Sequence, residues 1–168
     1  METPYLLQTR TVSRATLTNV QTIGLTVLRV AIGWHFLYEG LAKLINPNWT
    51  AAAYLNDSQG LFSPLFLLIS STPAILRAVD VLNMWGLVAI GLGLMSGLFT
   101  RYAAIAAMAL LILYYLAAPP FPGLEYSIPG EGSYIIVNKN LVECCALMVL
   151  VLIPTERLFG LDRLFRKD

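Results

Sequence analysis

Long apolar runs separated by short polar breaks divide this chain. Four of the runs are candidate membrane spans, at about residues 22–45, 79–99, 102–118 and 138–153. A helix of about 20 mostly apolar residues is needed to cross the hydrocarbon core of a bilayer. The pattern therefore predicts an all-α membrane protein, a four-transmembrane-helix bundle that makes residues 1–168 a single integral membrane domain.

The breaks between the runs contain residues that end or start helices. Asn46-Pro47-Asn48 ends the first run, and Thr72-Pro73 is typical of a helix start with proline at the first helical position. The apolar piece 61–70, interrupted by Pro64, is too short to cross a bilayer. We expect it to be an interfacial or re-entrant segment between the first and second spans.

Basic residues near the ends of the spans predict the orientation. Arg10, Arg14 and Arg101 fall on the same side of the predicted bundle as the basic residues of the tail 155–168. Loops rich in Lys and Arg stay in the cytoplasm, so we expect both the N and C termini to be cytoplasmic. The tail also alternates apolar and charged positions, which predicts a short amphipathic helix on the membrane surface.

The first span has one polar side. On a helix, Arg29, His35, Glu39 and Lys43 share roughly a third of the circumference, opposite an apolar face. The last three follow at i, i+4 spacing, so their charges can simply neutralise one another. Charged groups at membrane depth cost several kcal/mol each unless they are paired or face protein, and by default they indicate a ligand or proton site. Four such groups exceed what one stabilising pair requires, which favours the second interpretation.

Polar residues of the other spans are predicted to meet this side at one depth. Alternate spans run in opposite directions, so the outer half of the bundle receives polar residues from all of them. The alternative for some of these residues is a position at the water boundary. The residues that converge in this way are His35, Glu39, Lys43, Asp80, Asn83, Trp85, Tyr114, Tyr115, Asn138, Lys139, Asn140 and Glu143, whereas Arg29 sits deeper.

A pocket with these side chains suits an amphiphile with a polar head and a lipid-soluble tail. Quinone is the obvious candidate, although another lipid or a small anion could bind in the same place. Proton transfer to a quinone would fall to the candidate catalytic residues Glu39, His35 and Glu143. The candidate residues for binding the quinone head group are Arg29, Lys43, Asn83, Trp85 and Asn140.

Composition excludes several other classes of protein. With 57% hydrophobic and 12% charged residues, the chain is too apolar for an ordinary soluble domain. Its net charge of +1 and the lack of a basic patch argue against nucleic acid as a partner. The two cysteines, Cys144 and Cys145, form no CxxC pair, and a single histidine is a poor basis for a metal or haem site. We therefore expect neither haem nor metal.

The chain resembles the DoxX-like membrane proteins over about residues 22–163, and within them the DoxD-type small subunit of thiosulfate:quinone oxidoreductase. Many DoxX-like sequences have a glutamate near the position of Asn83, and this departure points to the DoxD-like branch. The resemblance is carried by Arg29, Gly33, Phe36, Gly40, Lys43, Asn46-Pro47-Asn48-Trp49-Thr50, Tyr54-Leu55, Asn83-Met84-Trp85-Gly86-Leu87, Gly91, Gly93, Gly97, Thr100-Arg101, Asn140, Glu143 and Gly160-Leu161-Asp162.

This resemblance implies a multi-pass subunit in the cytoplasmic (inner) membrane of a bacterium or archaeon. Such a subunit passes electrons from an extracytoplasmic donor, such as a reduced sulfur compound, to ubiquinone or menaquinone. Besides membrane lipid and quinone, its expected partner is a second extracytoplasmic or membrane subunit, or a second copy in a homodimer.

Two other functions stay open. One is a non-catalytic membrane scaffold or assembly partner. The other is a carrier for a small solute, which four short helices without an inverted repeat make hard to build. Binding of quinone distinguishes the oxidoreductase subunit from the scaffold and from the carrier.

Overall fold

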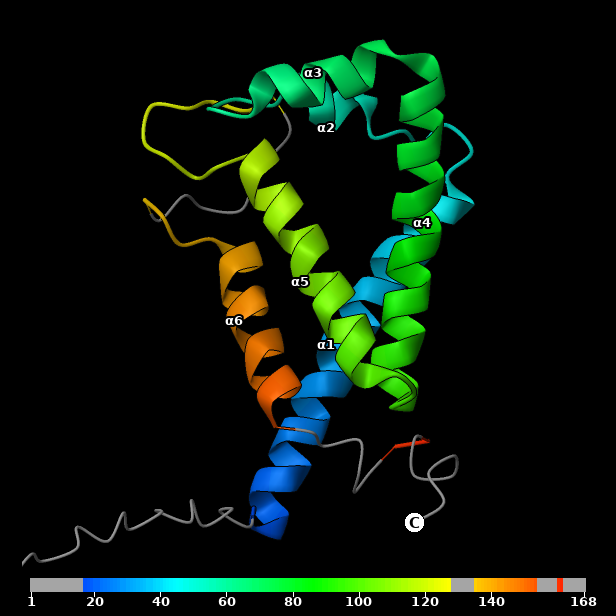
Figure 1. Ribbon diagram of the computed structural model, residues 1–168, viewed down its shortest axis with the longest axis vertical. Coiled ribbons are helices and arrows are strands. Elements are labelled where there is room, and N and C mark those ends of the chain that lie inside the picture. Colours follow the sequence, from blue (N-terminus) through cyan, green and yellow to red (C-terminus); the bar gives the residue numbers. More distant parts are fainter. Residues whose placement is uncertain (1–16, 128–134, 154–159, 162–168) are drawn as a thin grey trace, which may run out of the picture.

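The computed structural model describes residues 17–127, 135–153 and 160–161, and this part of the chain consists of helices and the loops between them (Figure 1). In chain order the helices are α1 (Asn19–Ile45), α2 (Ala52–Asn56), α3 (Ser63–Ser71), α4 (Pro73–Ser96), α5 (Thr100–Ala117) and α6 (Lys139–Leu152). The predicted all-α class is confirmed for the described residues.

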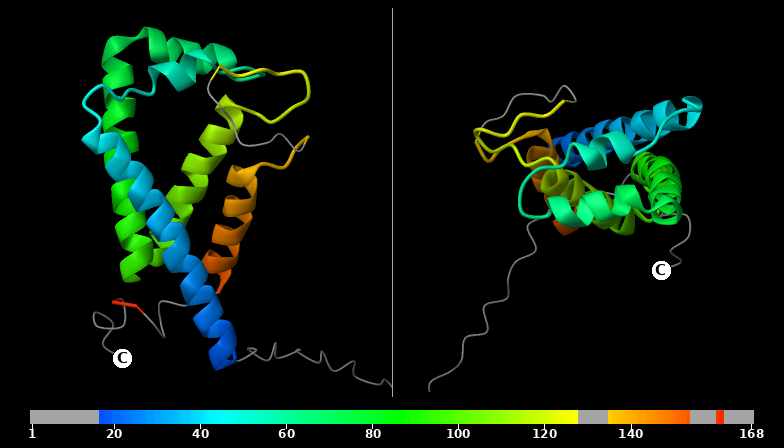
Figure 2. Two further views of the ribbon diagram at one scale, coloured as in Figure 1. Left: turned by 180° about the vertical axis from the view of Figure 1, so that it is seen from behind. Right: turned by 90° about the horizontal axis from the view of Figure 1, so that it is seen from above.

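Four long helices run alternately up and down, and two short ones lie across one end. α1 and α5 ascend in the view of Figure 1, whereas α4 and α6 descend. α1 packs along α4, and α5 packs along α6 (Figure 2). α2 and α3 cover the end at which α1 and α5 finish. α3 contains most of the predicted interfacial piece, but Pro64 lies at its start and does not interrupt it, because a proline is tolerated in the first turn.

Three helices, α1, α4 and α5, are long and apolar enough to cross a membrane. α6 has 14 residues, which at 1.5 Å per residue gives a length of about 21 Å, short of the roughly 30 Å hydrocarbon core. The fourth span therefore stays a prediction, as does the orientation of the termini. The predicted amphipathic tail lies largely outside the described residues.

Local backbone chemistry sets the helix ends. α1 begins three residues before the predicted span because Thr18 and Gln21 form a capping box. α4 starts at Pro73 as predicted but ends at Ser96, not at Phe99. The reason is Gly97, which takes the left-handed conformation at φ 71° that closes many helices.

Glycines bring the backbones of α1 and α4 into contact. A Cβ atom added to Gly91 would lie 2.5 Å from the backbone nitrogen of Leu37, and one added to Gly40 would lie 2.8 Å from that of Val88. Small residues permit such close approach between membrane helices. Within this helix pair Arg29 is buried and Lys43 is mostly buried, whereas the His35 and Glu39 side chains remain about half exposed.

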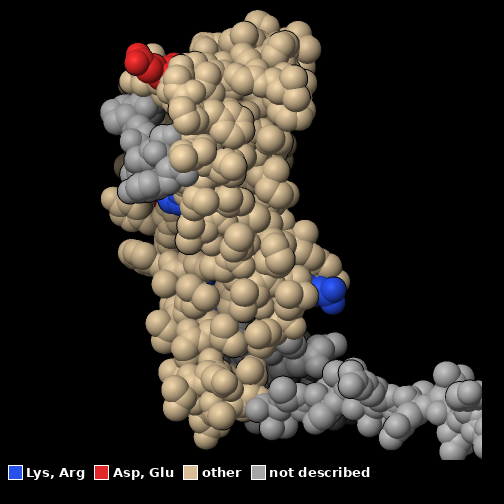
Figure 3. Space-filling view, turned by 90° about the vertical axis from the view of Figure 1, so that its left-hand side faces the viewer, with Lys and Arg blue, Asp and Glu red and all other residues tan. Residues whose placement is uncertain are grey.

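Apolar side chains cover most of the molecule. The face in Figure 3 is almost entirely uncharged, with only a few Lys, Arg, Asp or Glu side chains visible. Large apolar residues such as Val27, Trp34 and Leu82 are exposed on the long helices. An exposed apolar surface of this extent is what contact with lipid requires.

Candidate functional site

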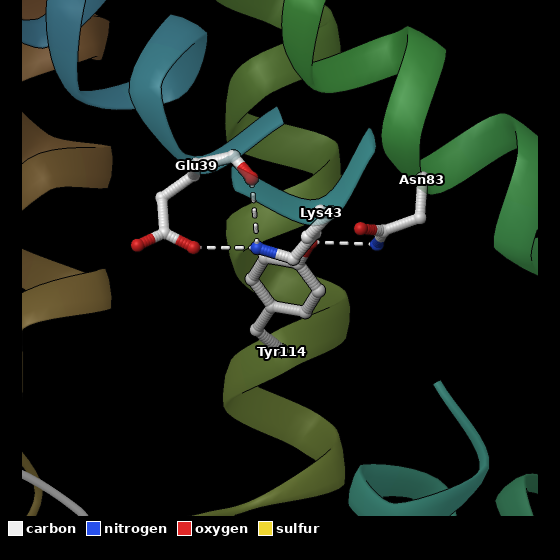
Figure 4. Close-up of polar contacts among 4 residues, drawn as sticks. All are labelled: Glu39, Lys43, Asn83 and Tyr114. Atoms are coloured by element: carbon white, nitrogen blue, oxygen red, sulfur yellow. Dashed lines mark hydrogen bonds and ion pairs between the residues drawn. The ribbon is translucent and has the colours of Figure 1, made fainter. Parts of the chain in front are cut away.

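Four polar side chains from three apolar helices point toward one another (Figure 4). Glu39 and Lys43 come from α1, Asn83 from α4 and Tyr114 from α5. We call these four residues the polar cluster. All four were expected to meet at one depth, and three of them, Glu39, Lys43 and Asn83, were predicted site residues.

Lys43 is at the centre of this cluster. Its Nζ lies 2.5 Å from Glu39 Oε2 and also donates to the Glu39 carbonyl oxygen at 3.4 Å. The ammonium lies 5.7 Å from the centroid of the Trp49 ring, within the range of a cation–π contact. The predicted i, i+4 neutralisation is thus confirmed for Lys43 and Glu39. The Glu39 side chain remains 45% exposed, so its carboxylate is accessible from outside the protein.

Asn83 and Tyr114 form the buried part of the cluster. Asn83 Nδ2 donates to the Tyr114 hydroxyl at 2.6 Å, and Asn83 as a whole is only 9% exposed. The Tyr54 hydroxyl donates to the Tyr114 backbone oxygen at 2.8 Å, which ties α2 to α5. Burial raises the pKa of Tyr54, so this hydroxyl keeps its proton at neutral pH.

His35 pairs with a different helix from the one its spacing suggested. Its Nδ1 lies 2.8 Å from Glu143 Oε1 on α6, whereas Glu39, four residues away, pairs with Lys43. His35 is partly exposed and Glu143 is mostly buried. Two adjacent side-chain pairs therefore follow one another along α1, a hydrogen-bonded pair that reaches α6 and an ion pair within α1 itself.

The structure does not bring the other predicted site residues into the cluster. Arg29 is buried near the opposite end of α4, where a Cβ on Gly97 would lie 3.2 Å from both terminal guanidinium nitrogens, Nη1 and Nη2. Gly97 is 14 residues from Asn83, about 21 Å along the helix. Trp85 is 59% exposed, and Asn140 is partly buried one turn before Glu143. Their assignment to a binding site stays a prediction.

Tyr114 belongs to the cluster and Trp49 contacts it through Lys43, but neither was assigned a role in the predicted site, although Tyr114 was expected to meet the other polar residues at the same depth. The place of Tyr114 near the outer end of a predicted span indicated its depth, but many membrane tyrosines lie there, so it gave no signal for a role in binding. Trp49 follows a helix-stopping Asn-Pro-Asn, where sequence alone cannot say which way the chain turns. Both contacts depend on tertiary structure.

Asp80 was expected to converge with the other polar groups or to lie at the water boundary, and the structure shows that it anchors the α2 region. It accepts hydrogen bonds from Thr50 Oγ1 at 2.9 Å and from the Ala51 backbone nitrogen at 2.8 Å. Together with Ser58, whose hydroxyl donates to the Ala117 carbonyl at 2.7 Å, it holds the α2 region against α4 and α5. The cover over the polar cluster is thus fixed at both sides.

The cluster offers an ammonium, a carboxylate, an amide and a phenol, which can hydrogen-bond the oxygens of a ligand and exchange protons with it. Within the described residues, no group of three or more His, Cys, Asp and Glu side chains is placed to hold a metal ion. A separate groove of about 450 Å³ between α4 and α5 has an apolar lining around Gly93 and Tyr102 and contains none of the predicted site residues.

The fold and the apolar helices define a multi-pass membrane protein. The DoxX family model matches residues 24–119, more than half of the chain, and the chain belongs to the DoxX family. The match includes all four residues of the polar cluster and ends before α6, which supplies Glu143. No curated protein and no solved structure matches the chain.

Proposed function

We propose that this protein is the membrane subunit of a quinone-linked oxidoreductase, closest to the DoxD-type small subunit of thiosulfate:quinone oxidoreductase. It binds a quinone head group at the polar cluster in the outer leaflet of a bacterial or archaeal cytoplasmic membrane. Electrons reach the quinone from an extracytoplasmic donor, such as a reduced sulfur compound, through a second subunit. Membership of a family associated with membrane oxidoreductase subunits supports this proposal.

The observation on which the proposal rests is the meeting of Glu39, Lys43, Asn83 and Tyr114 between apolar helices. Placing a lysine and a glutamate at membrane depth costs free energy, so such residues are found where they are paired or functional. The partly exposed carboxylate of Glu39 leaves room for contact with a ligand from the membrane. An amphiphile suits this arrangement, because its polar head can contact the polar cluster while its tail stays in the lipid.

Each side chain has a definite part in this proposal. A quinone takes up two electrons and two protons when it is reduced. The Lys43 ammonium donates a hydrogen bond to a head-group oxygen and stabilises the negative charge that reduction creates there. The Glu39 carboxylate can take up a proton and pass it to the head group, and the His35–Glu143 pair can relay protons to Glu39 from the water outside, so that two successive transfers supply both protons.

A structural role is the second candidate, and one observation favours it. Glu39 is paired with Lys43 and His35 with Glu143, so all four ionisable groups have partners within the chain. Pairs of this kind can have a purely structural role, in which they hold the helices together in a scaffold for other subunits. In that case Lys43→Ala would change the abundance of a complex and leave quinone reduction unaltered.

Native mass spectrometry of the gently purified protein tests the proposal, because it reports bound small molecules and stoichiometry together. We expect a bound quinone that a soluble head-group analogue displaces. Lys43→Ala should lose the bound quinone, whereas Leu82→Ala, at an exposed position on α4, should keep it. Purified protein with no quinone, and none bound after addition, would leave the scaffold as the better account.

A further inference from the structure

The amide oxygen of Asn83 is a buried hydrogen-bond acceptor without a donor among the described residues. Its Oδ1 is inaccessible to solvent in the protein alone, and Asn83 is 9% exposed. Leaving such a group unsatisfied destabilises the fold, so buried acceptors in folded proteins nearly always have a donor. A donor from outside the described residues would remove this cost.

The orientation of the amide is fixed by its neighbours. Asn83 Nδ2 donates to the Tyr114 hydroxyl at 2.6 Å, and Tyr54 holds the backbone of Tyr114 through a second hydrogen bond of 2.8 Å. With Nδ2 engaged in this way, Oδ1 is the free end of the amide. Figure 4 shows it on the side of Asn83 that faces Lys43.

We infer that Asn83 Oδ1 accepts a hydrogen bond from a hydroxyl group of the ligand, so that the polar cluster binds the hydroxyl-bearing, reduced form of the head group more tightly than the carbonyl form. This inference rests on the proposed quinone site. A carbonyl oxygen placed against Oδ1 would bring two acceptors together, whereas a hydroxyl supplies the missing donor. Lys43 can donate to an oxygen of either form and does not discriminate between them.

Tighter binding of the reduced form makes the bound head group a better electron acceptor. A hydrogen bond to a buried, otherwise unsatisfied acceptor is expected to change affinity by about tenfold. For a two-electron couple, a tenfold difference in affinity between the two forms raises the reduction potential by about 30 mV. Asn83 is therefore a binding residue that favours electron flow toward the quinone.

The test uses the full chain in detergent micelles under anaerobic conditions. Durohydroquinone, duroquinone and the dimethyl ether of durohydroquinone are titrated by isothermal calorimetry into the wild type, Asn83→Leu and the matched control Leu82→Ala. We expect the wild type and the control to bind durohydroquinone about tenfold more tightly than duroquinone or the ether. Asn83→Leu, which keeps the shape of the side chain and removes the amide, should bind all three equally.

The outcomes separate this inference from the proposed function. If durohydroquinone and duroquinone bind the wild type equally well, or the preference persists in Asn83→Leu, the inference is wrong while the quinone site stands. If no probe binds the wild type, both are wrong. Should Asn83→Leu fail to fold, Tyr114→Phe tests the inference instead. It removes the hydroxyl that holds the Asn83 amide in one orientation, so the preference for durohydroquinone should fall.

Discussion

His35 on α1 lies within hydrogen-bonding distance of Glu143 on α6, with 2.8 Å between Nδ1 and Oε1. The two residues are 108 positions apart in sequence. His35 is inside the part of the chain that the DoxX family model matches, and Glu143 is outside it. This pair therefore connects the matched helices to α6, which otherwise packs mainly on α5.

Glu143→Leu should weaken this connection. The change removes an interhelical hydrogen bond within the bundle, and such bonds contribute about 1 kcal/mol in membrane proteins. We expect the free energy of unfolding in mixed micelles to fall by about that amount, and Glu143→Gln, which keeps an acceptor, to lose less. Val142→Ala, at an exposed position on the same helix, is the control. Equal stability of Glu143→Leu and the control would mean that the pair does not hold α6 in place.

Gly91→Ala should separate α1 from α4. The new Cβ would lie 2.5 Å from the backbone nitrogen of Leu37. A backbone atom cannot move aside as the end of a flexible side chain can. Overpacking of this kind costs about 1–3 kcal/mol, which should appear as a lower midpoint of unfolding. Gly86→Ala on the same helix has no atom within 4 Å of its Cβ and should be neutral or stabilising by about 0.5–1 kcal/mol. Equal midpoints of unfolding for Gly91→Ala and Gly86→Ala would show that α1 and α4 are not in close contact at Gly91.

Asp80→Ala should loosen the cover formed by α2 and α3. The carboxylate accepts two hydrogen bonds from Thr50 and Ala51, and its removal leaves a mostly buried backbone N–H without an acceptor. We expect faster hydrogen exchange of the amides of residues 51–55, by a factor of ten or more for a loss of about 1.4 kcal/mol. Asp80→Asn, which retains one acceptor oxygen, should show a smaller increase. Unchanged exchange in Asp80→Ala would contradict the anchoring role.

The Tyr54 hydroxyl should make stability fall at alkaline pH. Its pKa is raised in the folded protein above its ordinary value of about 10, so the protonated form is the one that folding favours. Its contribution is complete below about pH 10 and is lost as the pH rises from there toward the folded value. Comparing unfolding of the wild type and Tyr54→Phe between pH 8 and 11 isolates this effect. The phenylalanine variant should be less sensitive to pH, and parallel curves would speak against a buried phenol.

The long helices and their polar groups are predictable because the signals are local. Apolar length identified α1, α4 and α5, and the i, i+4 spacing of Glu39 and Lys43 led to a pair that the structure contains. The Thr72-Pro73 start of α4 follows from the same kind of short-range chemistry. The end of α4 was misplaced because the apolar run continues to Phe99, whereas the left-handed conformation of Gly97 ends the helix at Ser96.

The partners of the remaining polar groups are not predictable from one sequence. His35 has a carboxylate four residues away, yet it pairs with Glu143, because the choice depends on where α6 lies. The greater depth of Arg29 was expected, since it lies several turns from Lys43 along α1, but its burial against Gly97 at the end of α4 depends on how the two helices pack. Asp80, Tyr54 and Trp49 acquire their contacts only when the loops fold over the bundle.

The most direct test of the account is the affinity of a soluble quinone head-group analogue for Lys43→Ala, measured beside the wild type and Leu82→Ala by equilibrium dialysis. Hydrogen bonds to charged groups contribute about 1.5–3 kcal/mol, so we predict that Lys43→Ala weakens binding at least tenfold while Leu82→Ala binds as the wild type does. Unaltered affinity in a folded Lys43→Ala variant would show that quinone does not bind at the polar cluster.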